Sequence, residues 1–199
     1  MTTSVSPIVQ TLTRVAGDGA VRASRGLSGL MGQEITIHVP SVRLGTKADA
    51  CDAVGGPETL VLGAYLSLDG DITGHVMLLF PVRRALDCVD LMCGQEKGTT
   101  TEPDELAESA IGELGNIVGS AFVNALADET NLILHPSPPT VVSDMAIALV
   151  ESVYAAVLSQ GGEVVMIDTV FEDSTGKTAG LLIVAPDPSC LVRLQELAA

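Results

Sequence analysis

The chain has 199 residues, of which 47% are hydrophobic and only 3% aromatic, so it can bury a substantial core of aliphatic side chains. Its formal charge is −15, from 25 acidic and 10 basic residues. Such a surface repels nucleic-acid phosphates and anionic lipids, which argues against both as partners. We expect the acidic surface to reflect adaptation to high salt, in preference to an acidic partner-binding surface.

Targeting signals are not predicted. The N-terminus "MTTSVSPIVQ" has no basic start, and no apolar run approaches the ~20 residues that cross a bilayer. We therefore expect a cytoplasmic protein without membrane insertion. The cysteines form no CxxC pair and are expected to be small apolar residues, not disulfides or metal ligands. They are Cys51, Cys88, Cys93 and Cys190.

The first half of the chain predicts a long helix, a strand, a β-hairpin and a short helix. These cover residues 7–31, 34–44, 59–81 and 82–94. Ser6-Pro7 starts the long helix and Gly32 ends it. Pro40 indicates a bulge or an edge in the strand, because proline cannot donate a ladder hydrogen bond. The hairpin turn is predicted at "DGD", residues 69–71.

A linker over about 95–102 follows, because "QEKGTTTEP" is polar and lacks large apolar residues. The second half then predicts the same order: a long helix, two short strands, an amphipathic helix, a hairpin and a closing helix. These cover about 101–127, 131–135, 140–143, 144–160, 163–186 and 188–198.

The two halves match each other. Pro40 aligns with Pro139 at an offset of 99 residues, and "GDITGHVMLLFP" aligns with "GKTAGLLIVAP". We predict an α/β (α+β) fold with pseudo-two-fold symmetry: one domain, 1–199, built from repeats at about 1–95 and 101–199. Two independent small domains are the alternative.

The second long helix has a broad apolar face and a narrow polar stripe. The apolar face is predicted to contain Leu106, Ala110, Ile111, Leu114, Ile117, Val118, Ala121 and Ala125. The polar stripe contains Ser109, Glu113, Asn116 and Ser120. Glycines at 112, 115 and 119 weaken the helix, and we expect them to let the two long helices approach closely.

The spacing of this stripe is specific. Ser109, three residues, Glu113, two residues, Asn116 and then 22 residues to Pro139, together with "ELGNIVG", resembles the signature of the CheC/CheX/FliY family of response-regulator phosphatases. The resemblance implies a sheet of about six strands with two long helices on one face. It also implies hydrolysis of the aspartyl-phosphate of phospho-CheY, a chemotaxis response regulator.

The resemblance also implies residue roles. Asn116 would orient a water for in-line attack, and Glu113 would engage the regulator's conserved Lys. An amide suits this task because it both donates and accepts hydrogen bonds without ionising. Ser109 and Pro139 would shape the site. No metal or other cofactor is expected on this chain, since the regulator brings its own Mg²⁺.

The first half departs from the pattern. Pro40 is kept, but Gly17 stands where the family has Asn, Arg14 where it has Glu, and Gln10 at the first position. Gly17 cannot hold a water and Arg14 would repel a Lys. We therefore predict one working site, with the first site degenerate.

Other functions remain to be weighed. The main alternative is a non-catalytic adaptor that binds phospho-CheY or CheD, the latter through the region "DMAIALVES" at 144–152. A flagellar switch component fits less well, because no switch-binding domain is seen in the sequence. We expect a monomer.

Metal binding is not expected. "DGDITG" at 69–74 imitates a calcium loop, but its twelfth position is Phe80 where a Glu is required. His38, His75 and His135 share no ligand spacing.

Overall fold

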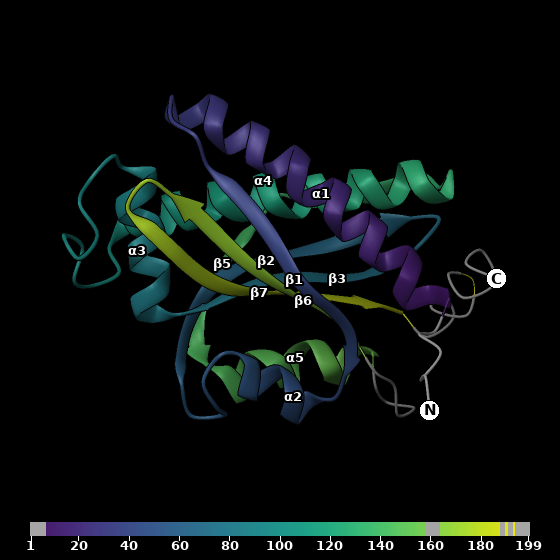
Figure 1. The fold of residues 1–199 in the computed structure, drawn as a ribbon. Helices are drawn as coiled ribbons and strands as arrows, with labels where there is room; N and C mark the ends of the chain where they lie inside the picture. The colour runs from purple at the N-terminus through teal and green to yellow at the C-terminus, as the bar shows by residue number, and fades with distance from the viewer. Residues whose placement is uncertain (1–6, 158–163, 188–189, 191–192, 194–199) are drawn as a thin grey trace, which may run out of the picture.

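The computed structural model describes residues 7–157, 164–187, 190 and 193 (Figure 1). The predicted closing helix over 188–198 lies outside the described residues except for Cys190 and Arg193, and the predicted cap Ser6 lies outside them as well.

The element order follows the prediction. The first half forms α1 (Pro7–Met31), β1 (Thr36–Gly45), α2 (Lys47–Ala53), β2 (Leu60–Gly70), β3 (Gly74–Pro81) and α3 (Val82–Met92). The second half forms α4 (Glu105–Thr130), β4 (Leu134–Pro136), β5 (Thr140–Met145), α5 (Ala146–Val157), β6 (Val164–Asp173) and β7 (Gly176–Pro186). The helix α2 was not predicted; the Thr46 hydroxyl and the Asp49 carboxylate form a reciprocal capping box at its start.

The seven strands form one antiparallel sheet in the order β1-β6-β7-β3-β2-β4, and β5 also pairs with β2. Each half supplies an edge strand to the other: β1 pairs with β6 of the second half, and β4 and β5 pair with β2 of the first. Seven strands replace the expected six because the second edge strand is interrupted. We continue to interpret the chain as one domain made of two repeats.

The two matched prolines lie in matching irregularities. Over 38–41, β1 contains one residue more than β6 opposite it, and Pro40 lies in this bulge. Over 136–140 the chain contains one residue more than β2 opposite it, and Pro139 lies there. A bulge leaves a backbone N–H outside the ladder, so a proline costs no hydrogen bond at either place.

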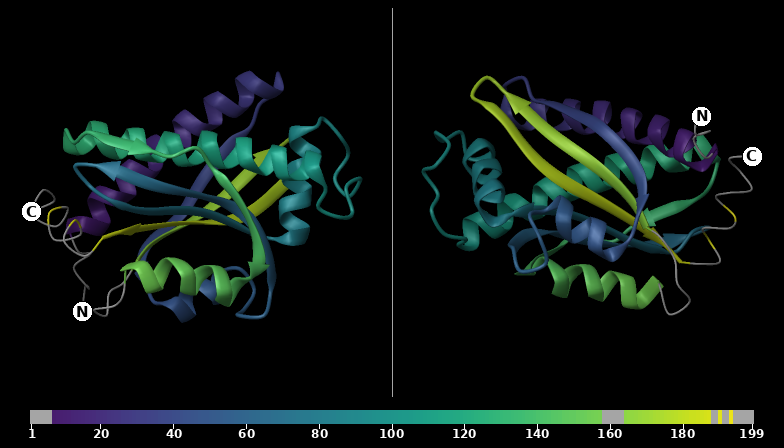
Figure 2. Two further views of the ribbon diagram at one scale, coloured as in Figure 1. Left: turned by 180° about the vertical axis from the view of Figure 1, so that it is seen from behind. Right: turned by 60° about the horizontal axis from the view of Figure 1, so that its bottom comes forward.

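The helices form layers on both faces of the sheet (Figures 1 and 2). The core between the sheet and α1, α3 and α4 is separate from the core beneath α2 and α5. The predicted pair of long helices on one face is thus confirmed. They run antiparallel, because Gly19 of α1 meets Phe122 of α4 and Gly26 meets Ile117 further back along α4.

The expected role of the α4 glycines is wrong. A Cβ on Gly115 would lie 2.1 Å from the Ala64 Cβ, and one on Gly119 would lie 3.2 Å from Leu66 side-chain atoms, so both glycines face β2. They let α4 lie directly on the sheet, in the same direction as β2. The close approach between the long helices comes from α1 instead, where a Cβ on Gly19 would lie 3.0 Å from the Phe122 Cα.

Substituting Gly115→Ala should destabilise the protein by more than ~2 kcal/mol, because the new methyl overlaps a buried residue and α4 must shift. Gly29→Ala is the matched control in α1, where a Cβ would meet nothing within 4 Å. It should stabilise by up to ~1 kcal/mol through helix propensity alone. Urea unfolding of both variants measures the two effects, and a loss of similar size in both would refute this account.

The predicted linker is anchored by a buried carboxylate. Asp90 is 0% exposed and accepts hydrogen bonds from the backbone N–H groups of Gly98, Thr99 and Thr100. Burial alone would raise the pKa of Asp90, but hydrogen bonds from Thr100, Gly98 and Thr99 outweigh it and hold the pKa below its ordinary value. The start of the second repeat is therefore fixed against α3.

Asp90→Ala should cost about 2–4 kcal/mol, because three backbone donors lose their acceptor. The folded pKa is lowered, so the carboxylate's contribution is present above the unfolded pKa of about 3.9 and is lost as pH falls through the folded value. Urea unfolding should thus show a wild-type advantage near neutral pH that shrinks in strong acid. Asp18→Ala, at an exposed position of α1, should change stability little at either pH.

Candidate functional site

Helix α4 is well defined at both ends. The Asp104 carboxylate accepts a hydrogen bond from the Ala107 N–H at 2.8 Å, and Glu105 and Glu108 lie in the first turn, where the helix dipole favours negative charge. Asn131 ends the helix in the left-handed conformation at φ 55°. The polar stripe is therefore carried by a stiff element with fixed ends.

The predicted apolar face is buried except for Leu106 at its start and Ile117, which is half-buried. Ala110, Ile111 and Leu114 are buried, whereas Leu106 is 58% exposed. The prediction for Leu106 is wrong, because it lies two turns before Glu113 and therefore on the same outer side of the helix. α4 is the one described helix long and apolar enough to cross a membrane by length and composition, but 61% of that apolar window is buried in the fold.

The predicted site residues lie along one outer side of α4. Ser109 and Glu113 are exposed, and Asn116 and Ser120 are half-buried. The Ser120 hydroxyl lies 3.5 Å from Asn116 Oδ1, the limit of a hydrogen bond, so the carboxamide keeps both amide N–H groups and one acceptor lone pair available. Among the described residues, no Lys, Arg or His forms an ion pair with Glu113.

Pro139 lies near this stripe. β5 begins at Thr140, whose partner in β2 is the residue before Leu66, so the bulge containing Pro139 is opposite Leu66. Leu66 in turn lies beneath Gly119, less than one turn from Asn116. Figure 2 shows the β4–β5 segment passing alongside α4. The sequence signature is thus gathered at one edge of the molecule.

The first-half counterparts lie on the outer side of α1. Arg14 is exposed and forms an ion pair with Glu129 in the last turn of α4, at 2.7 Å. Gly17 is exposed, and a Cβ added there would have no neighbouring atom within 4 Å. Pro40 is exposed in the β1 bulge. Arg14 therefore neutralises an acid at the negative end of a helix dipole.

The histidines and the calcium-like loop have other surroundings. His38 lies 2.7 Å from Glu172, and His75 lies 2.7 Å from the Tyr65 hydroxyl. The turn between β2 and β3 is formed by residues 71–73, slightly later than the predicted 69–71, because Asp69 and Gly70 still belong to β2. Within the described part of the chain, no three His, Cys, Asp or Glu side chains come together as metal ligands. Burial raises the pKa of the Cys88 thiol to about 12, which keeps it a neutral core residue.

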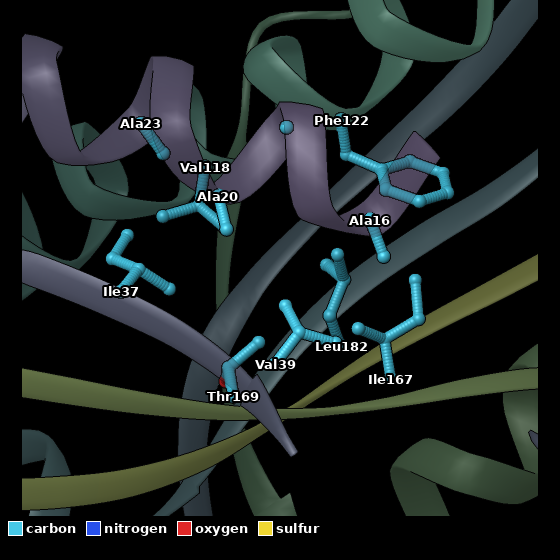
Figure 3. A pocket seen from close by; sticks show the side chains of 11 residues that line it. Ala16, Ala20, Ala23, Ile37, Val39, Val118, Phe122, Ile167, Thr169 and Leu182 are labelled. Atoms are coloured by element: carbon cyan, nitrogen blue, oxygen red, sulfur yellow. The ribbon is translucent and has the colours of Figure 1, made fainter. Parts of the chain in front are cut away.

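A small apolar cavity lies beneath the crossing of α1 and α4 (Figure 3). The cavity volume open to the centre of a water molecule is about 10 Å³. The cavity could therefore hold about one water and is too small for a substrate. Thr169 points into it, and the Thr169 hydroxyl has no hydrogen-bond partner among the described residues.

A larger hollow of about 380 Å³ lies at the other face of the sheet. It is lined by Arg43, Arg84 and Asp168 among others, and Arg43 is already paired with Asp168. Neither hollow contains Glu113 or Asn116. The predicted pair stands on an open surface, which suits a macromolecular substrate better than a small molecule.

Comparison with known proteins identifies relatives. The CheC-like family model matches residues 106–143, the segment that holds the stripe and Pro139. The chain is 29% identical over 166 residues to the CheY-P phosphatase CheC of Bacillus subtilis (strain 168), a match that covers 82% of this chain and 79% of that protein.

Solved structures share the fold at lower identity. FliY of Thermotoga maritima matches with a TM-score of 0.79 and 18% identity, over 98% of both chains. The FliM middle domain of H. pylori matches with a TM-score of 0.66 and 11% identity, over 98% of this chain and 99% of that one. Sequence motif, curated relative and fold agree with the resemblance drawn from the stripe on α4: the chain is similar to CheC-like proteins in sequence and shares its fold with FliY.

Proposed function

We propose that this chain is a cytoplasmic chemotaxis phosphatase that hydrolyses the aspartyl-phosphate of phospho-CheY at one site on α4. The observation that carries the proposal is the exposed alignment of Glu113 and Asn116 on a rigid helix, with the Pro139 bulge beside them. The homologous B. subtilis protein bears the name CheY-P phosphatase, which supports the same substrate.

Asn116 would position the attacking water. Its half-buried carboxamide is restrained by Ser120 on the next turn, so the free N–H groups and the remaining lone pair point in limited directions. Phosphoryl transfer depends on placement and charge stabilisation more than on covalent help, and the acyl phosphate is already reactive. Orientation of one water would then need to supply only ~2–4 decades of rate, or about 3–5.5 kcal/mol.

Glu113 would bind the lysine of the regulator. Its carboxylate is exposed and lies one turn before Asn116, on the same side of α4. Because no cation of the described residues pairs with it, an incoming ammonium would meet an uncompensated charge. No cofactor is required on this chain, since the Mg²⁺ of such a reaction would be held by the regulator.

Asn116→Ala should lower phosphate release from phospho-CheY by about 100-fold or more, since the water loses its orienting amide. Asn124→Ala is the matched control: the same substitution at an exposed position two turns further along α4. It should keep activity within about twofold. Release of phosphate is followed with purified regulator, and equal loss in both variants would contradict the assignment.

The first site is proposed to be inactive. Arg14→Ala removes an exposed ion pair with Glu129 and a long hydrogen bond to Thr11, and should leave turnover within about twofold of wild type. Gly17→Asn introduces an amide into open space and should not raise turnover while Arg14 remains. The same phosphate assay decides, and a loss in Arg14→Ala comparable to that in Asn116→Ala would mean that the first half is catalytic.

The second candidate is an adaptor that binds phospho-CheY or CheD without hydrolysis. The fold is shared with FliM of H. pylori, which has been solved in a complex with FliG, so this architecture also occurs in a binding partner. The region 144–152 proposed for CheD includes the end of β5 and the start of α5, beneath the sheet. Binding of phospho-CheY with no acceleration of its decay, with CheD present and at high salt, would select the adaptor.

A further inference from the structure

A buried leucine supports α4 directly beneath the polar stripe. Leu66 of β2 is 0% exposed and belongs to the core on the side of the sheet that faces α4. A Cβ on Gly119 would lie 3.2 Å from both Leu66 Cδ atoms, so the two methyl groups of the leucine lie against the backbone of the helix. Leu66 therefore sets the height of α4 above β2 at this level.

Asn116 lies between two contacts of this kind. Gly112 precedes it by four residues and Gly119 follows it by three, so the three residues lie on neighbouring turns along one side of α4. A Cβ on Gly112 would lie 3.4 Å from a methyl group of Val141 on β5, and Gly119 lies on Leu66. The distance from the carboxamide to the bulge before β5 thus depends on how closely α4 approaches these two side chains.

Thr169 occupies the corresponding position in the first half. The bulge of β1 that contains Pro40 lies opposite Thr169, as the second bulge lies opposite Leu66. Ala20 of α1 precedes Gly119 by 99 residues, the same offset that relates the two matched prolines. Ala20 and Thr169 both line the small cavity beneath α1 (Figure 3). The cavity therefore lies where the second half has the contact of Leu66 with the helix.

The two long helices are thus supported differently at matching places. Threonine lacks the δ-methyl groups that Leu66 presents to α4, and a cavity remains beneath α1. The Thr169 hydroxyl points into this cavity without a hydrogen-bond partner in the described part of the chain. The helix with Gly17 in place of Asn116 is therefore also the helix without a close support at this level.

We infer that Leu66 is a positioning residue of the site on α4, whose δ-methyl groups hold the helix at the height that places the Asn116 carboxamide beside the Pro139 bulge. The inference rests on the proposed function and adds a residue that acts through Asn116 without touching the substrate. Phosphoryl transfer depends on placement, and a misplacement of about 1 Å can cost about 100-fold in rate. Loss of the support should therefore lower kcat and leave KM nearly unchanged.

Leu66→Val tests this role, because valine stays apolar and branched but lacks the δ-methyl groups that reach the helix. It should lower kcat for phosphate release about tenfold, with KM within about twofold. Leu66→Met preserves the volume of the side chain and should keep kcat within about threefold of wild type.

Leu182→Val is the matched control. Leu182 is a buried leucine of the same core, but it lies on β7 and lines the cavity beneath α1. Its truncation should lower the urea midpoint to a similar extent as Leu66→Val and leave kcat within about twofold of wild type. Urea unfolding verifies that every variant is folded under the conditions of the phosphate assay.

A second measurement reports the position of Asn116 without activity. The side-chain amide signals of Asn116 in an NMR spectrum are identified by their loss in Asn116→Ala. Leu66→Val should shift these signals, because the helix settles toward the sheet, whereas Leu182→Val should leave them in place.

The outcomes separate the two proposals. Unchanged kcat in Leu66→Val, an equal fall in Leu182→Val, or unmoved Asn116 signals would overturn the positioning role, and the proposed function stands as long as wild type hydrolyses phospho-CheY. If wild type releases no phosphate, the proposed function fails. The NMR comparison then decides the positioning role alone: a shift of the Asn116 signals confined to Leu66→Val supports it, and any other result overturns it.

Discussion

The contact of α4 with β2 positions the polar stripe of α4 and the segments around it. Gly115 lies so close to Ala64 that no side chain fits between them, and the helix is held directly on the sheet. This contact fixes the height and rotation of α4, and rotation decides which residues face outward. The glycines cost helix propensity, but they bring the stripe to the level of the Pro139 bulge, which belongs to the strand next to β2.

The two halves differ in which features they keep. Both retain the bulge with its proline, and each gives its edge strand to the other, because a sheet edge without its partner would expose unpaired backbone groups. The outer side of α1 carries no such constraint, since nothing packs against Gly17. Arg14 there has gained a use in the fold by pairing with Glu129. Pairing within the sheet thus constrains the strands and their bulges in both halves, whereas the outer side of α1 is free of that constraint.

The sequence predicted the elements whose signals are local. Hydrophobic periodicity and capping residues gave α1 over 7–31 and the two hairpins close to their observed bounds. It missed α2, because that helix is short and polar and depends on a capping box hidden in a loop-like segment. It also could not tell that Gly115 meets a strand and not a helix, since a glycine shows that something approaches closely but not what.

The stripe itself could be recognised because its spacing is fixed by helix geometry, whereas the surface around it could not. Leu106 continues the apolar run at the start of α4, but it lies two turns before Glu113 and therefore on the outer side of the helix, where it is 58% exposed. The sequence does not show how much of the outer side of a helix its neighbours cover. The sequence also did not reveal the role of Asp90. Its hydrogen-bond donors, Gly98 and Thr100, lie eight and ten residues later in a polar segment that the sequence predicts as a free linker.

Charge and apolar exposure on this edge are best understood together. A carboxylate such as Glu113 attracts a lysine strongly at low ionic strength, but the Debye length falls from about 8 Å at physiological salt to about 3 Å near 1 M. A net charge of −15 keeps the protein soluble under such conditions, yet the same salt removes the long-range attraction that an acidic surface would exert on a basic partner. Apolar contacts are not screened by salt and can be strengthened by it. Leu106, exposed on the same side of α4 as Glu113, is the kind of contact that would keep its strength at high salt, whereas the attraction of Glu113 for a cation would act only at short range.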